Sequence, residues 1–272
     1  MDSKTSTRTV KLPAQHLRKL AKQLLNAHPL HCSSTPPIVP LSDSEPRVRI
    51  VCISDTHNHQ PDLPPGDLLV HAGDLSENGS FDEIQAQLIW LSSQPYQYKV
   101  VIAGNHDVLL DEEFLQKYPE RRYGQTKTRL DLNWGSVHYL QDSSVTLDFT
   151  FDEDPNQGGS RCQRKRQLTI YGSPWTPQYT ISAFQYSPDE DIWTGKIPLN
   201  SDIVVTHGPP RMHLDVPGFR HAGCPYLARE IFRVRPRLFL FGHIHASYGR
   251  EDIILDEVRR AHDEIIGNRG DW

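Results

Sequence analysis

Short apolar, β-favouring runs recur along this chain, and several of them end on an aspartate, asparagine or histidine. The first three runs occupy residues 49–54, 67–72 and 99–103. Between the last two, residues 80–92 have the apolar spacing of a helix, and Ser80 and Glu83 are placed to form a capping box. Strand, crossover helix, strand is typical of a parallel sheet covered by helices. The pattern therefore predicts an α/β fold.

Later segments extend this prediction to a second sheet. Strands are expected there at residues 137–140, 144–147 and 168–172, and further strands at 203–206 and 238–241. Helices are expected at 222–233 and 251–266. The polar segment 152–166 is interpreted as a solvated hairpin loop in preference to an anion site.

The N-terminal segment differs in composition from the rest of the chain. Residues 8–28 predict a basic amphipathic helix, and residues 31–46 are an irregular linker rich in proline and serine. We predict two parts, residues 1–46 as helix and linker, and residues 47–272 as one folded domain. The basic helix favours packing on the body or a partner, with a mitochondrial presequence as the alternative.

Charge and hydropathy exclude several classes of protein. The 272 residues carry a net charge of −5, so no global basic field attracts nucleic acid. No apolar run approaches the roughly 20 residues of a membrane span, and no secretory signal is evident. We expect a cytoplasmic protein that does not bind membranes, with a mitochondrial location as the alternative. The partner expected from these properties is a small substrate.

Potential metal ligands follow directly on the predicted strands. In parallel sheets the carboxyl ends of the strands form the ligand site, so these side chains are expected to converge. Glycines at 73, 104 and 242 let the backbone approach that site closely. Carboxylate, amide and imidazole ligands together suit divalent ions. The seven candidates are Asp55, His57, Asp74, Asn105, His207, His243 and His245.

The spacing of these residues sorts them into two metal sites. Residues two apart at a strand end point to the same side, which pairs Asp55 with His57, and His243 with His245. Asp74 can bridge two cations with its two oxygens. One consistent arrangement gives the first metal Asp55, His57, Asp74 and His245. The second metal then takes Asp74, Asn105, His207 and His243.

Two such cations, about 3.5–4 Å apart, clamp the attacking and leaving oxygens of a phosphoryl displacement and generate a hydroxide near neutral pH. His106, beside Asn105, is placed to protonate the leaving alkoxide or stabilise phosphate charge, and Asp107 is predicted to orient it. The two catalytic candidates are therefore His106 and Asp107.

These motifs together resemble the calcineurin-like metallophosphoesterase superfamily. The resemblance covers roughly residues 47–250, and stretches such as 171–175 and 206–210 are similar to its metallophosphoesterase-domain-containing (UPF0046) branch. It implies a four-layer α/β/β/α sandwich of two mixed sheets flanked by helices. It also implies hydrolysis of phosphomonoesters or phosphodiesters, cyclic nucleotides included, with two divalent ions of manganese, iron or zinc. After Gly249 the branch continues with closing strands, where this chain has a charged segment.

Two other functions remain open beside a working phosphoesterase. A metal-binding scaffold or regulatory protein of low activity would keep the same ligands. An exonuclease is disfavoured, because following a nucleic acid requires phosphate neutralisation by basic residues.

Overall fold

The computed structural model describes residues 14–28, 47–122, 124–152, 163–216 and 221–267. The chain divides into two compact units, one of residues 40–251 and one of residues 1–39 with 252–272. The predicted linker 31–46 lies outside the described residues. None of the helices in the described ranges has the length and apolarity needed to cross a bilayer.

The larger unit begins with a parallel sheet. Its strands run in the order β1-β2-β3-β4, and all three pairings are parallel. The strands are β1 (Ile50–Ile53), β2 (Leu68–Ala72), β3 (Tyr98–Ile102) and β4 (Val137–Tyr139). Helix α2 (Phe81–Ser93) crosses from β2 to β3, and it begins with the predicted capping box of Ser80 and Glu83. Helix α3 (Glu112–Lys117) follows β3.

A second, mixed sheet packs against the first. Its order is β10-β9-β6-β5, in which only the β5–β6 hairpin is antiparallel. The strands are β5 (Ser143–Asp152), β6 (Gln163–Ser173), β9 (Ile203–Thr206) and β10 (Leu238–Leu240). Helix α4 (Pro225–Val234) connects β9 to β10, and a two-stranded ribbon pairs β7 (Thr176–Pro177) with β8 (Gln185–Tyr186).

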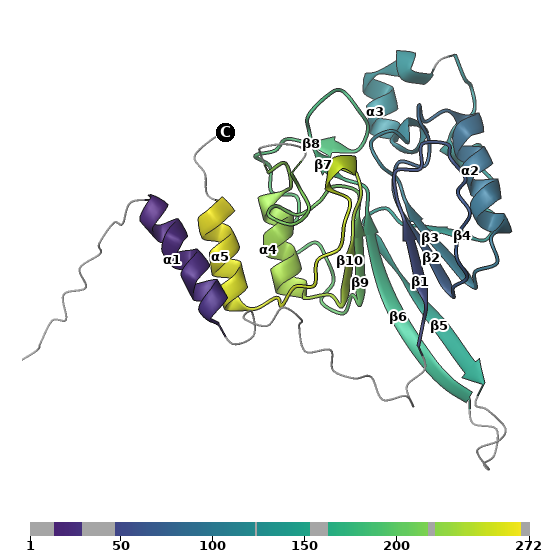
Figure 1. The fold of residues 1–272 in the computed structure, drawn as a ribbon. Coiled ribbons are helices and arrows are strands. Elements are labelled where there is room, and N and C mark those ends of the chain that lie inside the picture. Colours follow the sequence, from purple (N-terminus) through teal and green to yellow (C-terminus); the bar gives the residue numbers. More distant parts are fainter. Residues whose placement is uncertain (1–13, 29–46, 123, 153–162, 217–220, 268–272) are drawn as a thin grey trace, which may run out of the picture. The chain divides into compact units, whose positions relative to one another are not determined.

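Alternating side chains of the first sheet build two cores. In β2, Leu69 joins the core that includes Ile84 and Leu88 of α2. Leu68 and Val70 point the other way, into a core shared with the second sheet. This alternation is the two-residue period of a strand, and here both faces are buried. The larger unit is thus layered as helix, sheet, sheet and helix (Figure 1), which confirms the predicted fold class.

The structure corrects the sequence prediction in two places. The segment 137–140 was expected in the second sheet, but β4 pairs with β3 in the first, which is parallel throughout and not mixed. A three-residue strand carries no sequence signal that says which sheet it joins. Segment 152–166 is also not all loop, because β6 already begins at Gln163 and the β5–β6 ladder extends there.

The smaller unit contains helices α1 (Ala14–Ala27) and α5 (Glu257–Gly267), which lie side by side. Both are predicted, but α5 starts six residues later than expected. Arg259 within it makes an ion pair with Asp263 at 2.9 Å. The N-terminal part of the predicted 8–28 helix, up to residue 13, lies outside the described residues.

Candidate metal centre

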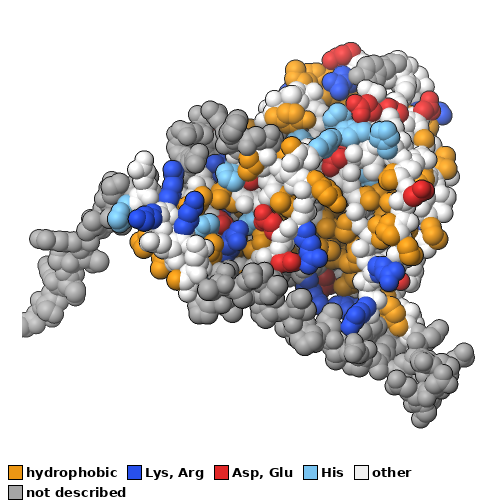
Figure 2. Space-filling model, viewed as in Figure 1, with side chains coloured by type: hydrophobic (Ala, Val, Ile, Leu, Met, Phe, Trp, Pro, Cys, Tyr) orange, Lys and Arg blue, Asp and Glu red, His pale blue; other side chains and the backbone are white. Residues whose placement is uncertain are grey.

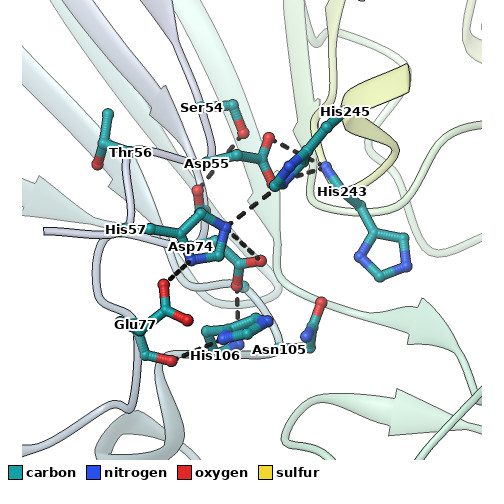
Figure 3. Close-up of polar contacts among 12 residues, drawn as sticks. Ser54, Asp55, Thr56, His57, Asp74, Glu77, Asn105, His106, His243 and His245 are labelled. Carbon is teal, nitrogen blue, oxygen red and sulfur yellow. Dashed lines mark hydrogen bonds and ion pairs between the residues drawn. The ribbon is translucent and has the colours of Figure 1, made fainter. Parts of the chain in front are cut away.

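The predicted ligands converge at the carboxyl ends of the strands. Asp55 and His57 follow β1, Asp74 follows β2 and Asn105 follows β3. From the second sheet, His207 follows β9, while His243 and His245 follow β10. The site therefore lies where both sheets present their strand ends, and Figure 3 shows Asp55, His57, Asp74 and His245 gathered there.

Three side chains form what we call the outer group: Asp55, His57 and His245. Each offers one ligand atom, and these atoms lie within 4.8 Å of one another. His245 Nε2 lies 3.4 Å from Asp55 Oδ1 and 3.4 Å from His57 Nε2. The side chain of His245 is 61% exposed. These are three of the four ligands predicted for the first metal. The fourth, Asp74, forms a separate candidate group with His57 and His106.

Three others form the inner group: Asp74, His207 and His243. Their ligand atoms also lie within 4.8 Å of one another. His207 Nε2 lies 3.2 Å from Asp74 Oδ2 and 3.0 Å from Asn105 Oδ1. His207 is completely buried, and its Nδ1 donates to the carbonyl of Ala72 at 2.9 Å, which directs Nε2 into the site. This group, with Asn105, matches the second predicted metal site.

Asp74 lies between the two groups. Its Oδ2 is 3.9 Å from His57 Nε2 on the outer side and 3.2 Å from His207 Nε2 on the inner side. Its Oδ1 accepts a hydrogen bond from the His106 backbone amide at 2.8 Å. A carboxylate in this place can hold two cations at once, as the sequence predicts for a bridging ligand.

The electrostatics of the inner group are those of a buried ion pair. Burial acts to raise the pKa of Asp74, but the charge and hydrogen bond of His207 outweigh it and hold that pKa well below its ordinary value. Burial likewise acts to lower the pKa of His207, and Asp74 raises it to about 9. Burial lowers the pKa of His243 to about 4, so its imidazole is neutral and keeps a lone pair for a metal.

Backbone strain is concentrated in this site. Asp55, His57, Asp74 and His243 all have positive φ, at 54°, 42°, 54° and 72°. Such left-handed conformations are uncommon outside glycine and cluster at functional sites. The chain therefore turns sharply after β1, β2 and β10, where these ligands lie.

Two glycines allow the close approach that the sequence predicts. A Cβ on Gly104 would lie 2.6 Å from His207 Cε1 and would also collide with the Asp74 carboxylate. A Cβ on Gly242 would overlap Ser54 and Asp55. Any side chain at these positions would push ligands out of place.

His106 faces the site, but its ring is not oriented by Asp107 as predicted. Its Nδ1 lies 2.7 Å from the carbonyl of Glu77, and its ring stands edge-on to His57 at 4.7 Å between centroids. Asp107, predicted to orient this ring, instead receives hydrogen bonds from the Leu75, Ser76 and Gly104 backbone amides and from the Ser76 hydroxyl. The carbonyl of Glu77 is therefore what orients His106.

Asp107 joins two ligand-bearing loops. The donors from Leu75 and Ser76 belong to the loop after β2, and that from Gly104 belongs to the loop after β3. Asp107 is completely buried, and burial raises its pKa to about 6, with the charge of Asp74 adding to the effect. Asp107 therefore stabilises the two loops that carry the ligands.

A cavity of about 490 Å³ opens over the ligands, and Figure 2 shows histidines gathered on this face. Its lining includes two residues that sequence reasoning missed. Glu77 Oε2 lies 3.2 Å from His57 Nδ1. Tyr179 accepts a hydrogen bond from Asn105 Nδ2 at 3.1 Å. Glu77 lies only three residues after Asp74, which is a usable signal, but nothing in the sequence links Tyr179 to the site.

The donors present fit divalent metals. Each group combines carboxylate oxygen with imidazole nitrogen, the set that manganese, iron and zinc accept. The ring nitrogen of His207 that faces away from the centre donates a hydrogen bond to the Ala72 carbonyl, whereas that of His57 lies 3.2 Å from Glu77 Oε2 as an ion-pair contact. Metal-ligating histidines are held in this way in proteins.

Comparison with known proteins agrees with this geometry. A family model described as calcineurin-like phosphoesterase matches residues 48–247. Human metallophosphoesterase domain-containing protein 1 is 36% identical over 240 residues, which cover 79% of this chain and 68% of that protein. A UPF0046 protein of Caenorhabditis elegans is 30% identical over 217 residues, 77% of this chain and 68% of its own length.

A fungal protein shows higher identity over a smaller part of its length. "Probable rhamnogalacturonate lyase C" of Emericella nidulans is 40% identical over 227 residues. These cover 83% of this chain but 20% of that protein. The chain therefore spans about a fifth of the fungal relative.

Proposed function

Because this chain belongs to the calcineurin-like phosphoesterase family, we propose that it is a two-metal phosphoesterase acting on a phosphodiester or a phosphomonoester. The observation that carries the proposal is the place of Asp74. Its carboxylate belongs to the inner group and also lies within 3.9 Å of His57 in the outer group. One shared carboxylate between two clusters of ligands is the arrangement that a two-metal site requires.

The outer group would hold one ion and the inner group, with Asn105, the other. When bound, such ions would supply Lewis acidity and would lower the pKa of a water molecule in the site. Asp74 would bridge them, and the neutral Asn105 keeps the site from becoming too negative. Manganese, iron or zinc satisfies this ligand set.

His106 is the proposed general acid. Its Nδ1–H donates to the Glu77 carbonyl, which leaves Nε2 as the nitrogen available at the cavity. In the imidazolium form Nε2 carries a proton that can be given to the leaving alkoxide. His106 also forms a candidate ligand group with His57 and Asp74, and the proposal assigns it to proton transfer in preference to metal binding.

The cavity supports a small phosphoester as substrate. Its volume of about 490 Å³ suits a nucleotide-sized molecule, such as a cyclic nucleotide. Among the described residues that line it, none is lysine or arginine, and Glu77 adds a negative charge. Binding would then depend on the metals and histidines, which disfavours a nucleic-acid chain.

The test is hydrolysis of bis(p-nitrophenyl) phosphate and p-nitrophenyl phosphate by metal-stripped protein, with and without Mn²⁺. We expect turnover only with metal, and loss of turnover in Asp74→Asn. Asp189→Asn, which alters an exposed carboxylate away from the cavity lining, should behave as wild type. Two bound metals with no turnover of either ester would favour the scaffold function instead. Full activity in Asp74→Asn would rule out the bridging role.

A further inference from the structure

Asn105 is the one amide ligand proposed for the inner metal, and its amide can bind in only one orientation. The oxygen Oδ1 must face the metal, because the NH₂ group has no lone pair to offer. In the structure Oδ1 does face the inner group, at 3.0 Å from His207 Nε2. Something must therefore hold the NH₂ end on the opposite side.

Two hydroxyls provide that hold. Asn105 Nδ2 donates to the Tyr179 hydroxyl at 3.1 Å and lies 3.4 Å from Ser182 Oγ. Asn105 is buried, so an NH₂ group turned away from these acceptors would lose hydrogen bonds without gaining water. The Tyr179 bond is the shorter of the two.

The segment that carries Tyr179 is anchored to the same loop. Residues 178–184 connect β7 to β8, and within them Ala183 N and Ser182 Oγ both donate to the Asn105 carbonyl, at 3.2 and 2.6 Å. Phe184 N donates to Asp111 at 2.7 Å. Tyr179 is thus held beside Asn105 by bonds that do not involve its own side chain.

Tyr179 also contacts a second inner ligand. Its ring stands edge-on to His243, with 5.0 Å between centroids. Asn105 and His243 lie on the side of the site away from His57 and Glu77, as Figure 3 shows. The side chain touches both ligands while remaining 57% exposed at the cavity.

We propose that Tyr179 is a positioning residue for the inner metal. Its hydroxyl fixes the Asn105 amide with the oxygen toward the ion, and its ring supports His243. This inference rests on the proposed two-metal function, whose inner ion it concerns. Tyr179 should therefore affect the binding of the inner ion and have no direct effect on the outer one.

The experiment is calorimetric titration of Mn²⁺ alone into metal-stripped full-length protein. Tyr179→Phe keeps the ring against His243 and removes only the hydroxyl. We expect the affinity for one of two Mn²⁺ equivalents to fall by about 10- to 100-fold, as for loss of an outer hydrogen-bond partner, with the other unchanged. Tyr179→Ala, which also removes the ring, should weaken that equivalent further.

The matched control is Tyr98→Phe. Tyr98 lies at the opposite end of β3 and donates its hydroxyl to the carbonyl of Asp148 at 2.9 Å, so this variant also loses one tyrosine hydrogen bond. Its Mn²⁺ isotherm should match wild type. Melting of each metal-free variant checks the fold.

To show that the weakened equivalent is the inner metal, the titration is repeated in His245→Ala, which removes an outer ligand. In that background Tyr179→Phe should weaken the equivalent that remains. Wild-type binding in Tyr179→Phe, or equal weakening of both equivalents, would overturn the proposal. If the wild-type protein binds only one equivalent of Mn²⁺, the two-metal function is refuted. The ratio of the Mn²⁺ dissociation constants of Tyr179→Phe and wild type would still decide the role of Tyr179.

Discussion

The inner and outer groups use the same residue types in different surroundings. In the inner group Asp74 and His207 are buried, and His207 is fixed by Ala72 and Asp74. In the outer group His245 is 61% exposed and sits on a short 3-10 helix, His245–Ser247. The fold thus holds the inner ligands more firmly than His245 of the outer group.

This contrast follows from where the ligands lie along the chain. His207 directly follows β9, a strand buried along its whole length, while His245 lies five residues beyond the end of β10. Ligands close to a buried strand inherit its rigidity, and preorganised ligands cost less to order on binding. We therefore expect the inner ion to bind more tightly and exchange more slowly.

Replacing His207 gives the largest expected effect and tests the inner half of the comparison. His207→Ala should lose the inner ion and nearly all turnover, and should lower the stability of the metal-free protein by about 3 kcal/mol, because Asp74 loses its buried partner. Metal analysis and denaturant unfolding measure this. His138→Ala, at an exposed histidine on β4, is the control. Unchanged metal-free stability would show that the inner group is not prefolded.

His106→Ala separates the proposed acid from both ligand groups. We expect kcat to fall by about 10²–10⁴ while both ions stay bound, as for loss of a general acid. Steady-state kinetics beside metal analysis give the two quantities. If an ion is lost from this variant, His106 belongs with His57 and Asp74 as a ligand.

The pH dependence of the stability of the metal-free protein measures the contribution of the ion pair between Asp74 and His207. The pKa of His207 is raised to about 9, so its stabilising charge is complete below about 6.5 and is lost as pH rises through 9. The lowered pKa of Asp74 keeps its charge throughout that range. Stability should fall by on the order of 2 kcal/mol between pH 7 and pH 10. A flat profile would contradict the ion pair, and His207→Gln should flatten it.

His245→Ala should have the smallest effect on stability. The residue is exposed, so the metal-free protein should unfold within about 0.5 kcal/mol of wild type. One metal equivalent should nevertheless bind more weakly in calorimetry, since an outer ligand is gone. A stability loss as large as that of His207→Ala would show that the two groups contribute equally to the stability of the metal-free protein.

The sequence predicts most of this site because the ligands follow strands that local pattern reveals. Asp55, Asp74 and Asn105 come directly after apolar runs, and parallel pairing brings such ends together. The same logic places His207 and His243 at the second sheet. All seven predicted ligands lie near one another, in three overlapping candidate groups with Asn105 beside His207, and their sorting into two metal sites stays a prediction.

What the sequence does not predict depends on contacts between distant segments. Strand β4 joins the first sheet through pairing with β3, a choice made by tertiary packing. Asp107 looks like a partner for its neighbour His106, yet it is buried and accepts hydrogen bonds from backbone amides instead. Tyr179 reaches Asn105 across 74 residues of chain, and no local pattern marks it.

The hydrogen bonds of Asp107 have a consequence for ion selectivity. By joining the loops after β2 and β3 through Ser76 and Gly104, this carboxylate fixes the spacing between Asp74 and Asn105 independently of any ion. A spacing that cannot adjust discriminates among ions by radius. Under the proposed two-metal function, the inner position should then select a narrower range of ionic sizes than the outer one.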